Sequence, residues 1–169
     1  MNFETLSLLE ERGILYIKLN RPEKRNAIIP QMLDELEQCI SEVAIKDSIG
    51  AVVISGEGKV FCAGMDFSEL GKPAGPDSQN LRRSLRKGQR VFSELEYLEK
   101  AVIAAIHGCA IGAGFEMALA CDLRIASEET TFSIPEVSIG AIPDLGGNQR
   151  LPRIVGVGRA KELILTGKK

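Results

Sequence analysis

The chain has 169 residues, of which 44% are hydrophobic and 26% are charged, and its formal net charge is −2. This length favours one domain, 1–169, with a buried core, and the slightly acidic balance disfavours binding to nucleic acid or to a membrane surface. No apolar run approaches the roughly 20 residues that span a bilayer, and the N-terminus shows no signal-peptide pattern.

The first quarter of the chain predicts a hairpin and then a helix. Residues 13–19 have the composition of a strand, which we expect to pair with 3–9 across a short turn. A polar loop follows at 20–26, and Pro30 can occupy the first turn of a helix. Four apolar residues then recur at helical spacing and predict a single buried face: Leu33, Leu36, Ile40 and Val43.

The middle of the chain predicts a covered strand, a loop and a long helix. The continuous apolar run 51–55 is typical of a strand covered on both faces, as in a parallel sheet. Residues 71–80 are rich in Gly, Pro and polar groups and predict a mobile loop. The spacing of apolar residues over 81–98 predicts a helix. Three arginines share another face of this helix, which is either a solvated surface or a phosphate site: Arg82, Arg86 and Arg90.

The last third continues the alternation of strands and helices. We expect strands at 102–106 and 123–126, and helices at about 114–120 and at 157–166. Between the first of these strands and its helix lies the glycine-rich run 108–114, which predicts a turn. This alternation indicates an α/β fold.

Cysteine and histidine usage narrows the possible chemistry. The four cysteines are widely spaced and form no CxxC pair, which favours reduced, structural thiols in a cytosol-like compartment over disulfides or a metal site. They are Cys39, Cys62, Cys109 and Cys121. His107 is the only histidine and is expected to end a buried strand, so a multi-histidine metal centre is not predicted.

Two small-residue turns, 61–67 and 108–114, each follow a predicted strand and precede a predicted helix. The glycines of the second turn are spaced G-x3-G-x-G, which differs from the G-x-G-x-x-G of dinucleotide-binding folds. A helix start offers free N–H groups to an anion. Turns at neighbouring strand ends can therefore aim two N–H groups at one oxygen and form an oxyanion hole.

Glu116 and Glu136 are the strongest candidates for chemistry. Each lies beside a glycine- or proline-bearing backbone, which is an unusual place for a merely solvated carboxylate. If they converge on one pocket, they can hold a water molecule between them, one acting as a base and the other as an acid.

Four motifs, taken together, identify a family. They are NRPEKRNA at 20–27, FCAGMD at 61–66, GAGFE at 112–116, and Pro135-Glu136 followed by GGNQRL at 146–151. In this order they resemble the enoyl-CoA hydratase/isomerase (crotonase) superfamily over essentially the whole chain. The resemblance implies a spiral of ββα repeats with two roughly perpendicular sheets.

The resemblance also implies a binding site for an acyl-CoA thioester, with no permanently bound cofactor and no metal. The backbone N–H groups of Met65 and Ala113 would form the oxyanion hole that polarises the thioester carbonyl. The implied substrate- and CoA-binding residues are Lys24, Arg25, Ala27, Ala63, Gly64, Asp66, Phe67, Gly112 and Pro135. Coenzyme A would enter only as part of the substrate.

In the implied hydratase mechanism, Glu116 activates water toward the β-carbon and Glu136 delivers a proton to the α-carbon. Asp144 stands where hydratases usually carry glycine, and a carboxylate there resembles the dienoyl-CoA isomerases. Asp144 either serves as a second acid or base for isomerisation or points away and caps the following turn; we favour the second interpretation. Three clustered carboxylates should include at least one with a raised pKa.

Two further expectations follow from the resemblance. Family members continue beyond this chain with helices that build a homotrimer, or a hexamer of two trimers, and that close part of the acyl pocket. The rival functions are an enoyl-CoA or dienoyl-CoA isomerase that uses Glu136 and Asp144, and a non-catalytic CoA- or RNA-binding protein that uses the basic helix face. Because few aromatic residues interleave that face, nucleic-acid binding is not expected.

Overall fold

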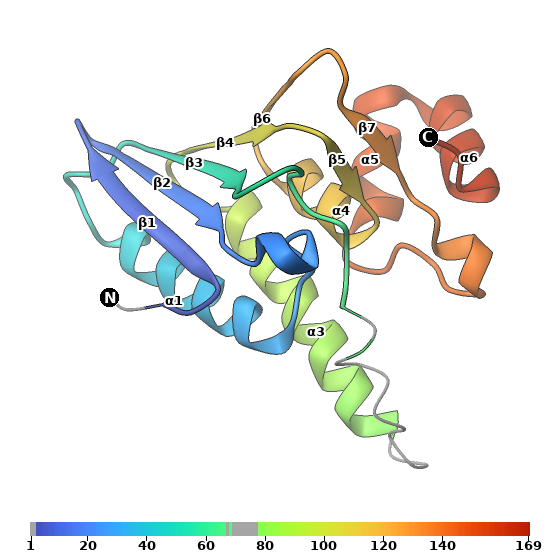
Figure 1. Cartoon of the computed structure of the whole chain (residues 1–169), viewed down its shortest axis with the longest axis horizontal. Coiled ribbons are helices and arrows are strands. Elements are labelled where there is room, and N and C mark those ends of the chain that lie inside the picture. The colour runs from blue at the N-terminus through green and yellow to red at the C-terminus, as the bar shows by residue number, and fades with distance from the viewer. Residues whose placement is uncertain (1–2, 67, 69–77) are drawn as a thin grey trace.

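The computed structural model describes residues 3–66, 68 and 78–169 (Figure 1). The chain begins with a hairpin of β1 (Leu6–Glu11) and β2 (Ile14–Leu19), which pair antiparallel as predicted. The turn between them places Arg12 and Gly13 at positive φ, 52° and 77°.

The larger sheet has five strands in the order β1-β2-β3-β4-β6. Its remaining members are β3 (Ala51–Gly56), β4 (Ala101–Ile106) and β6 (Leu123–Ala126), and the strands from β2 to β6 run parallel. Because parallel neighbours end at the same edge, the segments after β3 and β4 emerge side by side. The predicted parallel arrangement is confirmed.

One face of this sheet carries the helices α1 (Pro30–Ala44) and α3 (Ser78–Glu96) (Figure 1). The expectation that β3 is covered on both faces is wrong, because Val52 and Ile54 are buried while the alternate residues are only half-buried. All four predicted apolar positions of α1 are buried, and Pro30 occupies its first turn. Leu98 lies just beyond the end of α3.

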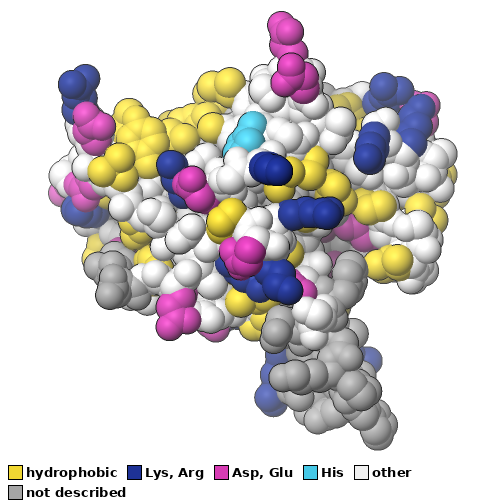
Figure 2. Space-filling view, in the orientation of Figure 1, with side chains coloured by type: hydrophobic (Ala, Val, Ile, Leu, Met, Phe, Trp, Pro, Cys, Tyr) yellow, Lys and Arg dark blue, Asp and Glu magenta, His cyan; other side chains and the backbone are white. Residues whose placement is uncertain are grey.

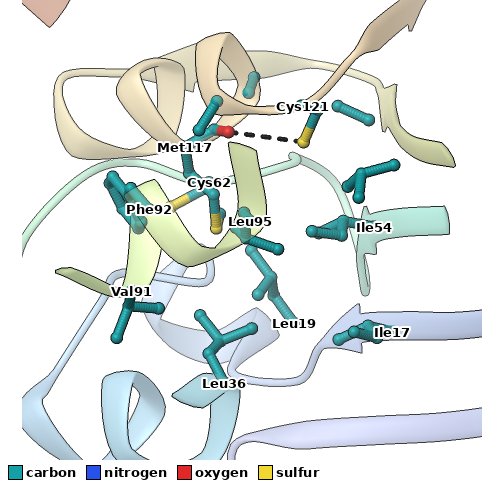
Figure 3. Packing of buried hydrophobic residues seen from close by; sticks show 14 of the residues in the cluster. Ile17, Leu19, Leu36, Ile54, Cys62, Val91, Phe92, Leu95, Met117 and Cys121 are labelled. Carbon is teal, nitrogen blue, oxygen red and sulfur yellow. Dashed lines mark hydrogen bonds between the residues drawn. The ribbon is translucent and has the colours of Figure 1, made fainter. Parts of the chain in front are cut away.

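The core lies between the sheet and these helices. Figure 3 shows side chains of β2, β3, α1 and α3 meeting there. They include Ile17, Leu19, Ile54, Leu36, Phe92 and Leu95, each no more than 1% exposed. Dense apolar packing of this kind fixes the strand ends and hence the loops that leave them.

A second, two-stranded sheet pairs β5 (Cys109–Ile111) with β7 (Thr131–Ser133) in parallel. The run 108–114 is therefore only partly a turn: its middle is a strand, and α4 (Ala113–Ala120) follows at once. The pattern did not reveal this strand because it is three residues long and its partner lies twenty residues further on. Two sheets in an α/β chain agree with the crotonase-like fold that the resemblance implies.

The chain ends in α5 (Gly147–Val155) and α6 (Val157–Thr166), of which only α6 was predicted. Two short 3-10 helices, η1 (Pro22–Lys24) and η2 (Glu136–Ile139), shape loops near the site described below. Most of the predicted mobile loop at 71–80 lies outside the described residues. Among the described helices, none is both long enough and apolar enough to cross a membrane.

All four cysteines are free thiols. Burial raises the pKa of Cys39, Cys62 and Cys121 to about 12, which keeps these thiols protonated and unreactive. The predicted reduced, structural role is in line with these environments.

Candidate active site

A cavity of about 720 Å³ opens where the loops that follow β3 and β5 meet η2 and the start of α5. Its wall includes Glu116, Glu136 and Asp144 together with Met65 and Ala113. The structure thus brings together all three carboxylates and both proposed oxyanion-hole residues, which come from four separate parts of the sequence.

Glu116 lies in the first turn of α4 and is 1% exposed. Its Oε1 accepts hydrogen bonds from the backbone N–H groups of Leu145 (2.9 Å) and Gly147 (2.8 Å). Burial raises the pKa of Glu116 to about 7, with a further rise from the charges of Glu136 and Asp144 and an opposing effect of the two hydrogen bonds. A carboxyl group with a pKa near neutrality is suited to proton transfer.

Glu136 begins η2, and its Oε2 is buried with no hydrogen-bond partner among the described residues. Burial, followed by the charge of Asp144, raises the pKa of Glu136. An unsatisfied buried oxygen is costly to a protein, so this carboxyl group is suited to bind something that enters the cavity.

Two glycines make room for the two glutamates. Gly112 has φ +51°, and a Cβ placed there would lie 2.5 Å from Glu136 Oε1. A Cβ at Gly147 would lie 2.9 Å from Glu116 Oε1. Since real Cβ atoms essentially never approach so closely, any larger residue at either position would displace a carboxylate.

The predicted oxyanion-hole groups lie on adjacent backbone segments. Ile28 donates to Gly64 O and accepts from Asp66 N, so the N–H of Met65 points away from Ile28. A Cβ on Gly64 would lie 3.8 Å from the Ala113 nitrogen, which places the two segments in contact. Within the described part of the chain, neither the Met65 nor the Ala113 N–H donates to a backbone carbonyl, which leaves both available to a ligand.

Asp144 lines the same cavity, and burial raises its pKa. The favoured expectation that it caps the following turn is wrong for α5, whose N-cap residue is Gly146 with no side-chain capping bond. The sequence did not decide this point because capping depends on backbone angles, and Gly146 takes a φ of +112° that a glycine permits.

The residues of the expected CoA surface divide into two groups. Ala63, Gly64, Gly112 and Pro135 line the cavity. Lys24, Arg25, Ala27 and Asp66 are not among its lining residues, and Phe67 lies outside the described residues. Lys24 and Arg25 are exposed, and this loop is tied to the cavity wall because Ala63 N donates to Arg25 O at 3.0 Å.

The loops at 21–27 and 61–66 are held together by residues whose structural role the sequence did not reveal. Asp66 accepts from both terminal nitrogens of Arg21 at 3.1 and 3.2 Å, and this partnership, after a hydrogen bond from Ser68, lowers its pKa. The fully buried Asn26 donates to carbonyl groups of the strand-end segment 57–61. Glu35, also missed, is a buried carboxylate on α1.

The remaining candidates lie apart from the cavity. His107 contacts Gly58 O through Nε2 at 3.0 Å and does not line the cavity. Arg82, Arg86 and Arg90 are all exposed, and Arg90 pairs with Glu37. On the face shown in Figure 2, basic and acidic side chains of the described residues are interspersed. No group of three or more His, Cys, Asp or Glu residues among those described could hold a metal ion.

Among the described residues, this α/β chain with two sheets thus brings three carboxyl groups to one cavity, beside two backbone N–H groups that donate to no backbone carbonyl. The family model described as "Enoyl-CoA hydratase/isomerase" matches residues 10–169. The chain belongs to the enoyl-CoA hydratase/isomerase (crotonase) family, which acts on CoA thioesters.

Relatives within the family carry both kinds of activity in their names. A short-chain-enoyl-CoA hydratase from Clostridium acetobutylicum is 40% identical over 99% of this chain and 64% of its own length. A peroxisomal Delta(3,5)-Delta(2,4)-dienoyl-CoA isomerase from Arabidopsis thaliana is 35% identical over 99% of this chain and 65% of its own length.

The fold comparison agrees with the family. The crystal structure of an enoyl-CoA hydratase from Bacillus anthracis superimposes with a TM-score of 0.91 at 38% identity, over 98% of this chain and 64% of that one. The chain therefore spans about two thirds of the length of these relatives.

Proposed function

We propose that the protein is an enoyl-CoA hydratase, which adds water across the 2,3 double bond of an enoyl-CoA thioester. The observation that carries the proposal is that Glu116 and Glu136 line one cavity, each fitted against a glycine. Water addition needs two groups that exchange protons on either side of one water molecule, and this pair can supply them.

Glu116 is the proposed base. Its Oε1 is held by two N–H groups, while Oε2 has no donor among the described residues. Ionised Glu116 takes a proton from the bound water as the water oxygen forms its bond to the β-carbon. With a pKa of about 7 for this group, a large fraction is ionised at neutral pH.

Glu136 is the proposed acid. Burial raises its pKa and so favours a proton on this carboxyl group. As the β-carbon gains oxygen, Glu136 gives that proton to the α-carbon, and the electron pair of the double bond forms the new C–H bond. After the product leaves, proton exchange with solvent returns a proton to Glu136 and removes one from Glu116.

The N–H groups of Met65 and Ala113 stabilise the negative charge that the thioester oxygen gains during the reaction. Because they are backbone donors on packed segments, they need no rearrangement when that charge develops. Loss of one such donor typically costs about 3–4 kcal/mol of transition-state stabilisation. The exposed Lys24 and Arg25 are proposed to meet the phosphates of coenzyme A.

A second candidate function, dienoyl-CoA isomerisation, is favoured by one observation: Asp144 lines the same cavity as Glu136. Two carboxyl groups at different positions along an acyl chain could move a proton between two of its carbons. The cytosolic location and the homotrimeric or hexameric assembly stay predictions.

The test is turnover of crotonyl-CoA, followed as loss of the absorbance of the conjugated thioester. It is run on this chain and on the chain completed with the C-terminal segment of the Clostridium acetobutylicum relative. We expect Glu116→Gln and Glu136→Gln each to lower kcat by about 10²–10⁴-fold, and Glu128→Gln, at an exposed site, to leave it unchanged.

Two outcomes would overturn the hydratase proposal. Unchanged hydration in the Glu116→Gln, Glu136→Gln double variant would exclude the paired-glutamate mechanism. Absence of hydration in wild type, together with 3,5-dienoyl-CoA isomerisation that is lost in Asp144→Asn, would transfer the assignment to the isomerase.

A further inference from the structure

The turn 144–147 supplies both of the hydrogen bonds that hold Glu116. Its Leu145 and Gly147 N–H groups converge on Oε1 of that side chain. The position of the carboxylate therefore depends on what fixes the peptide units of this turn. The fixing groups come from outside the cavity, on α3 and on the first turns of α5.

Gln89 of α3 holds the first of these peptide units. Its Nε2 donates to Asp144 O at 2.9 Å. The Asp144 carbonyl and the Leu145 N–H belong to the same peptide unit, so a donor at the carbonyl strengthens the hydrogen bond at the N–H. Gln89 and Glu116 thus bind opposite edges of the same peptide unit.

Arg150 of α5 holds the peptide unit that joins Leu145 to Gly146, which lies between the two units that bind Glu116. This side chain is buried, and its Nη1 donates to Leu145 O at 3.0 Å. Its remaining nitrogens reach Glu96 at the end of α3, with Nε at 2.9 Å and Nη2 at 2.7 Å from Oε2. Gly146 leaves the space for this guanidinium, since a Cβ there would lie 1.7 Å from Nη1.

α3 also contacts the turn directly, at the residue before Gln89. A Cβ on Gly88 would lie 3.0 Å from a methyl group of Leu145, so the helix contacts the turn directly. Three points along one helix, at positions 88, 89 and 96, therefore fix the turn, the last of them through Arg150. None of these three residues is among the described residues that line the cavity.

We propose that Gln89 and the Glu96–Arg150 ion pair are positioning residues for Glu116, because Gln89 holds one of the peptide units that bind its carboxylate and Arg150 holds the unit between them. The placement of Glu116 in this fold then depends on α3, a helix that contributes neither of the paired glutamates. The part of the proposal that concerns turnover rests on the hydratase function; the part that concerns Glu116 itself does not.

The charged groups around Glu116 define what should change. Glu136 and Asp144 raise its pKa, and the two N–H bonds from the turn lower it. If the turn loses its supports, those bonds weaken while the neighbouring charges remain. The pKa of Glu116 should then rise by about one for each hydrogen bond lost.

The test compares three variants with matched controls in the full chain. Gln89→Met, Glu96→Gln and Arg150→Met remove one support each, and Gln149→Met and Arg153→Met are controls at exposed sites on α5. The readout that needs no turnover is a ¹³C NMR titration of the Glu116 carboxyl carbon, assigned by its absence in Glu116→Gln. Circular dichroism verifies that each variant is folded.

We expect a raised Glu116 pKa in Gln89→Met, Glu96→Gln and Arg150→Met, and an unchanged Glu116 pKa in the two controls. In a hydrating enzyme, kcat should fall about 10- to 100-fold with KM little changed, and the acid limb of the pH profile should move to higher pH. An unchanged Glu116 pKa in folded Gln89→Met and Glu96→Gln would overturn the proposal, even if Arg150→Met lowers stability. If the wild-type protein shows no hydratase activity, the proposed function is refuted, but the titration still tests whether these residues position Glu116.

Discussion

Replacing Glu116 by Gln should stabilise the folded chain while it lowers the proposed hydration activity. Glutamine keeps the shape of the side chain, and its Oε1 can still accept the hydrogen bonds of Leu145 and Gly147. What the substitution removes is a negative charge in a site that is 1% exposed and that faces Glu136 and Asp144.

The magnitude follows from the pKa of Glu116. Burial raises it from 4.5 to about 7, and each pKa unit corresponds to about 1.4 kcal/mol. The ionised folded state is therefore disfavoured by about 3 kcal/mol relative to the unfolded chain. Because the folded pKa is the higher one, the contribution of Glu116 to stability is greatest below pH 4.5 and is lost as the pH rises through about 7.

Urea unfolding at pH 5 and at pH 8, followed by circular dichroism, tests this reasoning. Comparing Glu116→Gln with wild type at each pH cancels the titration of groups that both proteins share. We expect the variant to be more stable by about 3 kcal/mol at pH 8, with a smaller advantage at pH 5. An advantage of equal size at both pH values would refute the argument, and Glu128→Gln should show none at either.

Three further outcomes are expected. Gly112→Ala should lower stability by about 1–3 kcal/mol and reduce turnover, because its φ of +51° strains alanine and its Cβ displaces Glu136; Gly50→Ala, where nothing lies within 4 Å, is the control, and a loss of the same size there would contradict the reasoning. Asp66→Asn should cost about 1.5–3 kcal/mol at pH 7, measured by urea unfolding, because Arg21 loses its carboxylate partner. This cost should disappear once the pH falls below the lowered pKa of Asp66. The missing C-terminal part should affect turnover more than coenzyme A binding: the chain alone should come closer to the C-terminally completed protein in its affinity for coenzyme A, measured by calorimetry, than in its turnover. Equal turnover of the two proteins would contradict this expectation.

The sequence predicted the elements whose signal is local and missed those whose partners are distant. The face of α1 and the strand β3 were recognisable because their apolar residues recur at helical spacing or form one run. The strand β5 was read as part of a turn, since its pairing with β7 is not visible in three residues. The helix α5 was missed because Gly147, Pro152 and four polar residues give it little helical signal.

For the site, the sequence could name residues but not their neighbours. Glu116 and Glu136 stood out because glycine and proline flank them, and both line the cavity. The roles of Gly112 and Gly147 in making room for these side chains depend on distances between segments far apart in the chain. The same is true of Asp66, which was expected at the CoA surface and is paired with Arg21.

Burial of a carboxylate does not by itself mark a residue for chemistry, as Glu35 demonstrates. It is 8% exposed, and although burial raises its pKa, hydrogen bonds from Thr5, Glu4 and Gln31 bring the pKa below its ordinary value. Both oxygens of Glu35 accept hydrogen bonds from the protein. Its charge is therefore satisfied, and its role is to connect α1 to the start of the chain.

Glu116 differs from Glu35 in the oxygen that it leaves unbonded. The turn 144–147 binds Oε1 alone, which fixes the side chain without satisfying Oε2 on the cavity side. Burial, together with the charges of Glu136 and Asp144, keeps the pKa of Glu116 near 7 and destabilises its ionised form. A water molecule placed between Glu116 and Glu136 would satisfy both carboxyl groups at once. The same feature that weakens the fold at neutral pH therefore favours binding of the molecule that the proposed reaction consumes.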